Sequence, residues 1–504
     1  MNFEEKVQSI RTWQVPSTVL RFHSIIDLLL IANDGTELQT STKLNLNDAN
    51  IQVHDTKYLA DALQKNTTLI SIHLEGNRIG SKGAQYLADG LQNNTVIQSI
   101  YLGKNNIGDV GALHIAEGIK YMKTLDLSYN QIGTHEVKYL SDALQNNQVN
   151  GIRHLFLREN KLGDQGVRSL VEGLRNNMTL ITLQLSDNQI GVKGAQYLSD
   201  FLRTNIERMR YLSEGLMKNT VCSLIDTTSS ISFWKIINTH FILTLSGNKI
   251  GITGAQYLID LLGNKKKLIK LDLRDNNLGD LGALHVSEVL QDNQILKSLN
   301  LSSNGISATI AEQIYALFEK NHKIVNLNLQ SKNIGDKGAK YIADALRNNI
   351  TLQDLDFKSN KIGEKGAQEL SFVLRNNRIL TKLSLGNNQI GCQGAQYLAE
   401  VLQHHPTLIT LELRNNQIKD EGTKYLADAL EFNRTLTVVY LQKNEIGDQG
   451  AQYFLDALEM NTTIISMDLR SNDIGDEGAS YLVDALKYNQ VTSSLAKSQK
   501  YVKN

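Results

Sequence analysis

Residues 179–204 read TLITLQLSDNQIGVKGAQYLSDFLRT, a stretch with two different hydrophobic periods. Leu183 and Leu185 alternate with polar residues at a period of two, which predicts a short strand with one buried face. Asn188 follows where the chain turns out of the strand, and its amide can satisfy backbone groups there. After Gly191 the apolar residues recur at helical spacing, which predicts an amphipathic helix behind the strand. The stretch therefore indicates one strand, one turn and one helix.

The same pattern, L-x-L-x-x-N-x-I-G, recurs along most of the chain, and eleven of its fourteen intervals are 28 residues. Its first apolar residue falls at positions 44, 72, 100, 125, 155, 183, 243, 271, 299, 327, 355, 383, 411, 439 and 467. A fixed period of about 20 to 29 residues with this wording resembles the leucine-rich repeat family. The 28-residue form is similar to the ribonuclease-inhibitor-like class of that family, and the resemblance covers residues 43–489.

One such repeat cannot bury its apolar face alone, so neighbouring repeats are expected to stack into a solenoid. Helices pack about 8 to 10 Å apart and strands about 4.8 Å, so the parallel sheet should line the concave side and the helices the convex side. The expected fold is an α/β leucine-rich-repeat horseshoe. Residues 1–43 are predicted to form an N-terminal cap, 44–489 the solenoid and 490–504 a polar tail. An Asp near the start of several helices is expected to cap free N–H groups, as at Asp336, Asp448 and Asp476.

The pattern is interrupted between Leu183 and Leu243, which are sixty residues apart where two repeats need 56. We predict an irregular region at 205–242, in which one strand and turn are missing and an off-pattern Ser/Thr-rich stretch is added. Three interpretations remain open for this region: a replacement strand, a protruding loop, or an artefact of the gene model. Phe233 and Trp234 within it are either a candidate contact for a partner or residues that pack over the gap.

The composition excludes several classes of function. The chain has 504 residues, with 52 basic and 52 acidic side chains, so no net positive field favours nucleic acid as a partner. Two cysteines, Cys222 and Cys392, cannot form a disulfide framework, which favours a reducing compartment and a cytoplasmic location. We find no signal peptide or membrane helix. Asn-x-Thr sequons, as at Asn66 and Asn461, arise from a repeated turn and are discounted as glycosylation sites.

No motif for enzymatic chemistry is present: the sequence contains no phosphate-binding loop, dinucleotide fingerprint, HExxH, GxSxG or kinase motif. His404 and His405 are the only close histidine pair, and a metal site there is not expected. We therefore predict a non-enzymatic protein with no cofactor and no metal.

The strand residues that project between the buried leucines form the predicted concave face, where solenoids of this type present an extended binding surface. In four repeats the residue between the two leucines is acidic and the residue two positions later is basic: Asp272 with Arg274, Asp356 with Lys358, Glu412 with Arg414, and Asp468 with Arg470. Residues i and i+2 of a strand share a face, so an acidic column should lie beside a basic one. The columns either neutralise each other or orient a charged partner.

Four aromatic side chains in consecutive repeats near the N-terminus are predicted to share this face: His73, Tyr101, Tyr129 and Phe156. Aromatic anchors dominate the energies of protein interfaces. This aromatic cluster is therefore the stronger candidate for contact with a protein partner. The sequence leaves open both the identity of that partner and the oligomeric state of the chain.

The wording GAQYLADALxxNxTLxxLxLxxNxIG, closely matched by residues 83–106, is similar to the repeats of NOD-like receptors of the CARD-containing class. That resemblance implies regulatory or innate-immune sensing through a bound protein, although no nucleotide-binding module or death-fold domain is recognisable here. Ribonuclease inhibitor is similar in period and implies a ribonuclease as partner, but its cysteine-rich composition is missing. Ran GTPase-activating protein also resembles this repeat class and implies GTPase activation, but the acidic tail expected of that family is replaced here by a basic-polar one.

Overall fold

The computed structural model describes residues 42–118, 120–146, 151–177, 179–204, 241–263, 268–290, 293–307, 323–330 and 334–488. The chain divides into two compact bodies, the N-terminal body Met1–Leu155 and the C-terminal body Phe156–Asn504. Apart from residues 42 and 43, the predicted N-terminal cap lies outside the described residues, as does the predicted tail. Within the described ranges, no helix combines the length and the apolar character needed to cross a membrane.

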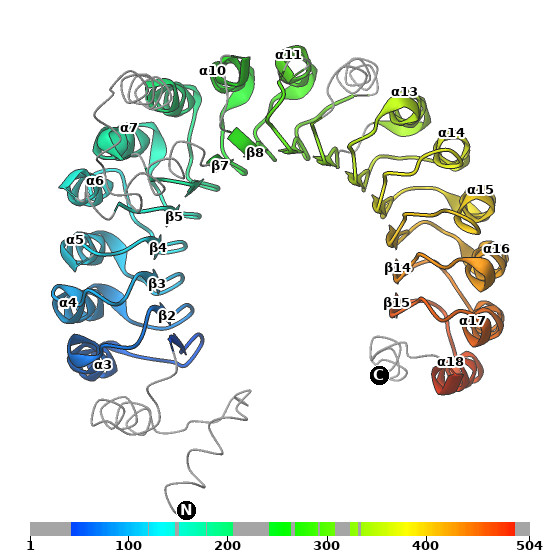
Figure 1. The fold of residues 1–504 in the computed structure, drawn as a ribbon, viewed down its shortest axis with the longest axis horizontal. Coiled ribbons are helices and arrows are strands. Elements are labelled where there is room, and N and C mark those ends of the chain that lie inside the picture. The colour runs from blue at the N-terminus through cyan, green and yellow to red at the C-terminus, as the bar shows by residue number, and fades with distance from the viewer. Residues whose placement is uncertain are drawn as a thin grey trace, which may run out of the picture. The chain divides into compact units, whose positions relative to one another are not determined.

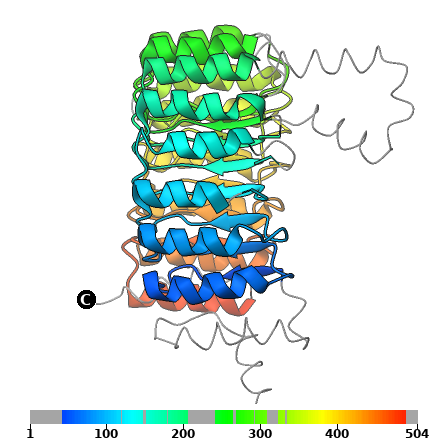
Figure 2. The ribbon, with the colours of Figure 1, turned by 90° about the vertical axis from the view of Figure 1, so that its left-hand side faces the viewer.

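The N-terminal body alternates short strands with helices. Its strands are β1 (Lys43–Asn45), β2 (Ser71–His73), β3 (Ser99–Tyr101), β4 (Thr124–Asp126) and β5 (His154–Phe156), the last of which contains the boundary between the bodies. Its helices are α3 (Val53–Lys65), α4 (Gly80–Leu91), α5 (Gly108–Gly118) and α6 (Val137–Asn146). Strands β1 to β4 pair in parallel, each with its neighbour along the chain. Helices α3 to α5, blue to cyan in Figure 2, lie side by side.

The C-terminal body continues the same alternation. Its remaining strands are β6 (Thr182–Gln184), β7 (Phe241–Thr244), β8 (Leu268–Asp272), β9 (Ser298–Asn300), β10 (Asn326–Asn328), β11 (Asp354–Asp356), β12 (Lys382–Ser384), β13 (Thr410–Glu412), β14 (Val438–Tyr440) and β15 (Ser466–Asp468). Its helices are α7 (Gly163–Gly173), the short 3-10 helix η3 (Leu174–Asn176), a helix at 192–204, α10 (Gly251–Gly263), α11 (Gly279–Leu290), α13 (Gly335–Asn348), α14 (Glu364–Leu374), α15 (Gly391–Leu402), α16 (Lys419–Phe432), α17 (Asp448–Met460) and α18 (Asp476–Tyr488).

Strands β6 to β15 form a parallel sheet in chain order. In this body the strands lie along the inner side of a curved stack and the helices along its outer side (Figure 1). The predicted leucine-rich-repeat solenoid, with a sheet on one face and helices on the other, is confirmed. The alternating leucines are the reason, because they point into the space between the two layers: Leu183 and Leu185 are both almost fully buried.

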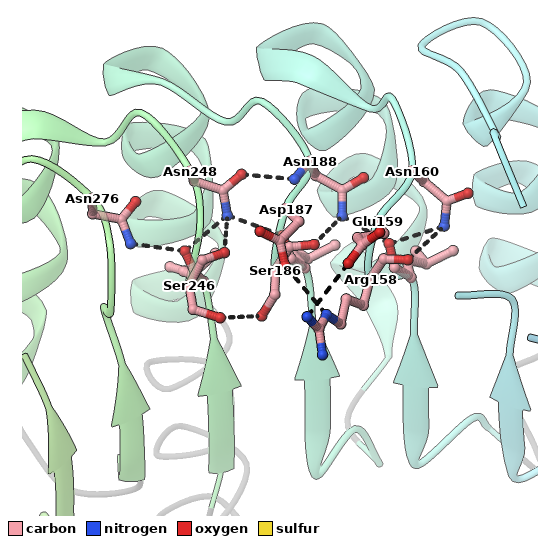
Figure 3. A network of polar contacts seen from close by, with 12 residues as sticks. Arg158, Glu159, Asn160, Ser186, Asp187, Asn188, Ser246, Asn248 and Asn276 are labelled. Atoms are coloured by element: carbon pink, nitrogen blue, oxygen red, sulfur yellow. Dashed lines mark hydrogen bonds and ion pairs between the residues drawn. The ribbon is translucent and has the colours of Figure 1, made fainter. Parts of the chain in front are cut away.

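A ladder of buried asparagines joins consecutive repeats at the ends of the strands. The Nδ2 of Asn248 donates to the carbonyl of Leu245 in its own repeat at 2.8 Å and to that of Leu185 in the preceding one at 3.1 Å. Its Oδ1 accepts the backbone N–H of Asn188 at 2.9 Å (Figure 3). The same oxygen accepts the N–H of Ile190, also at 2.9 Å. One side chain therefore satisfies four backbone groups that the turn leaves without partners.

The ladder and the sheet pass directly across the interrupted region. β6 pairs with β7 in register, with Leu183 opposite Leu243, although sixty residues separate them. The helix at 192–204 packs against α10, where the hydroxyl of Ser199 donates to the carbonyl of Tyr257 at 2.7 Å. A replacement strand between β6 and β7 is therefore excluded, and residues 241 and 242 belong to β7. Phe233 and Trp234 lie outside the described residues.

The aspartates near the helix starts cap a different helix from the one that carries them. Asp336 lies in the first turn of α13, and its Oδ1 accepts the N–H groups of Gly363 at 2.6 Å and Gly366 at 3.0 Å, at the start of α14. A Cβ on Gly366 would lie only 2.6 Å from the same oxygen, so glycine at this position leaves room for the carboxylate. Asp448 likewise caps α18 through Gly475 and Gly478. Each helix start of this kind therefore depends on the preceding repeat.

Candidate functional site

The open face of the N-terminal sheet carries a pair of stacked rings. His73 at the end of β2 and Tyr101 at the end of β3 occupy the same register, and their ring centroids lie 4.2 Å apart with an interplanar angle of 13°. Both side chains are half-buried. Burial, followed by the charge of Lys43, lowers the pKa of His73 below its usual value, so the imidazole is neutral at neutral pH. The pair therefore places two half-buried rings side by side on this face.

The other two predicted aromatic residues do not extend this stack. Tyr129 lies on the turn after β4, with φ of 60°, three residues beyond the strand position that His73 and Tyr101 occupy. Its ring lies under the Nζ of Lys104, 4.9 Å from the centroid, and Lys104 occupies the same turn position of the preceding repeat. Tyr129 therefore lies on the turn and not at the strand end that His73 and Tyr101 occupy. Phe156 does end a strand, β5, and is half-buried in the C-terminal body.

Most acidic residues of the predicted column have a structural partner in their own backbone. Asp272 accepts the N–H of Arg274 at 3.0 Å through Oδ1, and the same bond forms from Lys358 to Asp356 at 3.0 Å. Asparagine and aspartate both accept this backbone N–H at the same position of other repeats: Asn45, Asp126, Asn300, Asn328 and Asp468. These bonds are Asx turns that close the end of the strand. The recurrence of Asp at this position therefore needs no partner to explain it.

The four predicted acid–base pairs behave differently from one another. Asp468 and Arg470 form a two-pronged ion pair, with Nε of Arg470 2.9 Å from Oδ1, and these bonds hold the pKa of the carboxyl low against the opposing effect of burial. Lys358 lies 3.7 Å from Asp356, whose pKa burial raises.

The remaining two pairs do not form. No ion pair joins Asp272 to Arg274, or Glu412 to Arg414, within the described ranges. Arg274 and Arg414 are exposed and have no carboxylate partner there, so they remain available on the sheet face.

One ion pair on this face joins two repeats that are not neighbours. The Nζ of Lys358, just after β11, lies 2.8 Å from Oε2 of Glu412 on β13, and so reaches across β12. The corresponding residues of β12 are small: Ser384, which is fully buried with no hydrogen bond to its hydroxyl, and Gly386. A Cβ on Gly386 would lie 3.0 Å from Oε1 of Glu412. Burial lowers the pKa of Lys358, but the bond to Glu412 and the nearby Asp356 outweigh it and raise the pKa above its usual value.

Sequence reasoning missed Glu75 and Gly103, each of which lies two residues beyond the end of its strand. Glu75 accepts the Nδ2 of Asn47 at 3.0 Å, and burial and the charge of Asp126 raise the pKa of its carboxyl. A comparison of the strand-end residues of three consecutive repeats, rather than of one repeat, would have found both Glu75 beside Gly103 and the contact of Lys358 with Glu412. In the described part of the chain, no group of three His, Cys, Asp or Glu side chains is arranged to hold a metal ion.

Twelve segments of the chain match one protein family. The family described as "Leucine Rich repeat" matches residues 65–88, 93–116, 119–134, 176–199, 264–286, 292–314, 320–343, 348–371, 376–399, 404–427, 432–455 and 461–483. Among solved structures, an internalin from Listeria monocytogenes is similar over 81% of this chain and 88% of its own, with 19% identity and a TM-score of 0.41. The TLR13–ssRNA13 complex is similar over 86% of this chain, which spans 57% of that chain, with 17% identity and a TM-score of 0.46. Because the family matches extend over more than half of its length, the chain belongs to the leucine-rich repeat family.

Proposed function

We propose that this protein is a non-enzymatic scaffold that binds a protein partner on the open face of its sheet. Leucine-rich repeats generally mediate protein–protein interactions, and a solenoid presents its sheet as an extended surface. The observation that supports this site best is the stacked pair of His73 and Tyr101, which leaves two half-buried rings on that face. Such rings contribute large contact area and lose little conformational entropy on binding.

The consensus sequence of the repeats, which resembles that of NOD-like receptors, supports a role for this surface in regulation or immune sensing. A cytoplasmic location is part of the same proposal. The sequon asparagines are consistent with it, because Asn66 and Asn461 are buried and accept backbone N–H groups through Oδ1, which leaves their amides inaccessible to glycosylation in the folded chain. Fractionation of cells that express the tagged chain checks the location, and recovery in the medium would contradict it.

Affinity capture from a native lysate, followed by mass spectrometry, tests the binding function. The full chain is compared with a His73→Ala/Tyr101→Ala variant and with a control, Phe372→Ala, that removes an exposed ring from α14 on the helical side. We expect a partner that is retained by the control and lost in the double variant. Far-UV circular dichroism confirms that all three proteins are folded. A partner that binds the double variant as well as it binds the native chain contradicts the placement of the site.

A second set of variants addresses the exposed cations. Arg274→Glu and Arg414→Glu reverse charges that have no carboxylate partner in the described structure, whereas Arg470→Glu breaks the pair with Asp468. If a partner contacts the C-terminal sheet face, the first two changes weaken capture without lowering the unfolding midpoint, and the third lowers the midpoint. Equal capture by the native chain and the first two variants would show that the partner does not depend on Arg274 or Arg414.

A further inference from the structure

The C-terminal body shows how its sheet accommodates a basic side chain. Lys358 lies across β12 between two carboxylates, 2.8 Å from Glu412 and 3.7 Å from Asp356. Gly386 has no side chain to block this route, and Ser384 is too short to do so. Three consecutive repeats therefore form a site for one ammonium group, with carboxylates on the outer two and a glycine on the middle one.

The N-terminal body has a related arrangement, in which His73 occupies the position of Asp356 and Tyr101 that of Ser384. Glu75 follows β2 at the position that Lys358 has after β11, Gly103 corresponds to Gly386, and Asp126 corresponds to Glu412. A Cβ on Gly103 would lie 3.4 Å from Oε1 of Glu75, so this carboxylate lies beside the glycine. The position that holds a cation in one body holds a second anion in the other.

Neither Glu75 nor Asp126 forms an ion pair with another described residue. Lys104, whose Nζ lies over the ring of Tyr129, acts on Glu75 through its charge and partly offsets the rise in the pKa of that carboxyl. Burial, and then the charge of Asp126, raise the pKa of Glu75, and burial raises that of Asp126. Two like charges that act on each other cost free energy, which a bound cation would reduce.

Tyr101 adds a second attraction for a cation. His73 covers one face of the Tyr101 ring, so the opposite face is on the side of β4, where Asp126 lies. An aromatic face beside carboxylates attracts ammonium and guanidinium groups. The protein forms a contact of this kind itself, between Lys104 and Tyr129.

We propose that Glu75, Asp126 and the face of the Tyr101 ring opposite His73 bind one lysine or arginine side chain of a protein partner, which lies across Gly103 as Lys358 lies across Gly386. This inference rests on the proposed binding function and specifies the chemistry of the partner. A basic segment complements the surface, whereas an acidic one would meet two carboxylates.

The test measures binding of a fluorescent hexa-arginine peptide to the full chain by anisotropy. A Glu75→Gln/Asp126→Asn variant removes both charges but keeps the internal hydrogen bonds. Asn300 and Asn328 already form the same Asx turn with an amide side chain, and a glutamine after β2 can accept the bond from Asn47. The control, Asp89→Asn/Glu117→Gln, removes the same charge from α4 and α5 in the same body, where both side chains are exposed. We expect binding to be roughly tenfold weaker in the site variant and unchanged in the control.

A second variant supplies the cation from the chain itself. Glu75→Lys should reach Asp126 across Gly103, raise the unfolding midpoint and abolish peptide binding. Equal affinity of the native chain and the Glu75→Gln/Asp126→Asn variant overturns the proposal, as does competition by calcium chloride alone, which would identify the ligand as a metal ion. The site variant keeps both rings, so a partner that requires His73 and Tyr101 but not the two charges contradicts this inference and leaves the proposed function intact.

Discussion

The backbone N–H of Asn188 donates to Oδ1 of Asn248 over 2.9 Å, although the two residues are sixty positions apart in the chain. Other repeats of the C-terminal body make the same bond over 28 positions, as Asn416 does with Asn444. The two repeats are therefore structural neighbours, and the additional 32 residues, the difference between the two spacings of 60 and 28, are not needed for the contact between them.

Deletion of about 32 residues from within 205–240 should therefore leave the solenoid folded, because it restores the usual spacing without removing a residue of the ladder. We expect unchanged helical ellipticity per repeat and an unfolding midpoint at least as high as that of the native chain. Thermal unfolding followed by circular dichroism measures both. Aggregation or loss of ellipticity would show that the removed segment contributes to the stack.

Removal of a helix-capping aspartate should destabilise the protein only where a following helix depends on it. Asp420 accepts the N–H groups of Gly447 and Gly450 at 2.7 and 2.9 Å, and we expect Asp420→Ala to cost about 1 kcal/mol of unfolding free energy. Asp476 has the same place in its repeat, but its carboxylate accepts no hydrogen bond within the described residues, so Asp476→Ala is the matched control. Urea unfolding of both variants measures the difference, and equal losses would argue against capping of the next helix.

His405 should make the protein sensitive to acid. It is buried, its Nδ1 accepts the N–H of Leu408 at 3.2 Å, and burial, followed by the charge of Arg378, lowers its pKa to about 4. The unfolded chain binds the proton near the ordinary pKa of 6.5, so the stability that neutral His405 provides is complete above that pH and is lost as the pH falls from 6.5 towards 4.

Asparagine occupies the corresponding position of the neighbouring repeats, at Asn377 and Asn433. His405→Asn should therefore fold normally and lose less stability between pH 6.5 and 4 than the native chain. Unfolding midpoints measured across this range test the expectation. Parallel curves for the two proteins would assign the acid sensitivity to other groups.

The contact between Lys358 and Glu412 should be worth more than an exposed ion pair. Both side chains are largely buried, 26% and 14% exposed, whereas Arg375 and Glu400 form a pair at 2.9 Å with 57% and 46% exposed. A double-mutant cycle with Lys358→Met and Glu412→Gln should give a coupling free energy of about 1 to 2 kcal/mol, against about 0 to 1 kcal/mol for the exposed pair. Similar values for the two pairs would mean that water screens them equally.

The period of the leucines predicted the strands, their order and the side that each residue faces, because burial of Leu183 and its counterparts leaves only one register open. It did not predict the direct pairing of β6 with β7, since sixty residues with an off-pattern stretch do not reveal whether another strand is inserted. The capping of Gly363 by Asp336 was also hidden, because that bond joins two repeats and the sequence pattern describes one.

The sequence predicted only part of the candidate site. Alternation placed His73 and Tyr101 side by side, but Tyr129 adopts a positive φ on the turn and leaves the strand column. Lys358 can reach Glu412 because Gly386 has no side chain in its path. A search of the sequence for charged residues overlooks a glycine.

Asp336, Asp420 and Asp448 each cap a helix of the following repeat, so the order of synthesis along the chain matches the order in which the caps are needed. The ribosome completes each aspartate before it completes the helix that the aspartate caps. The first turn of each new helix of this kind therefore meets a capping carboxylate that has already been synthesised.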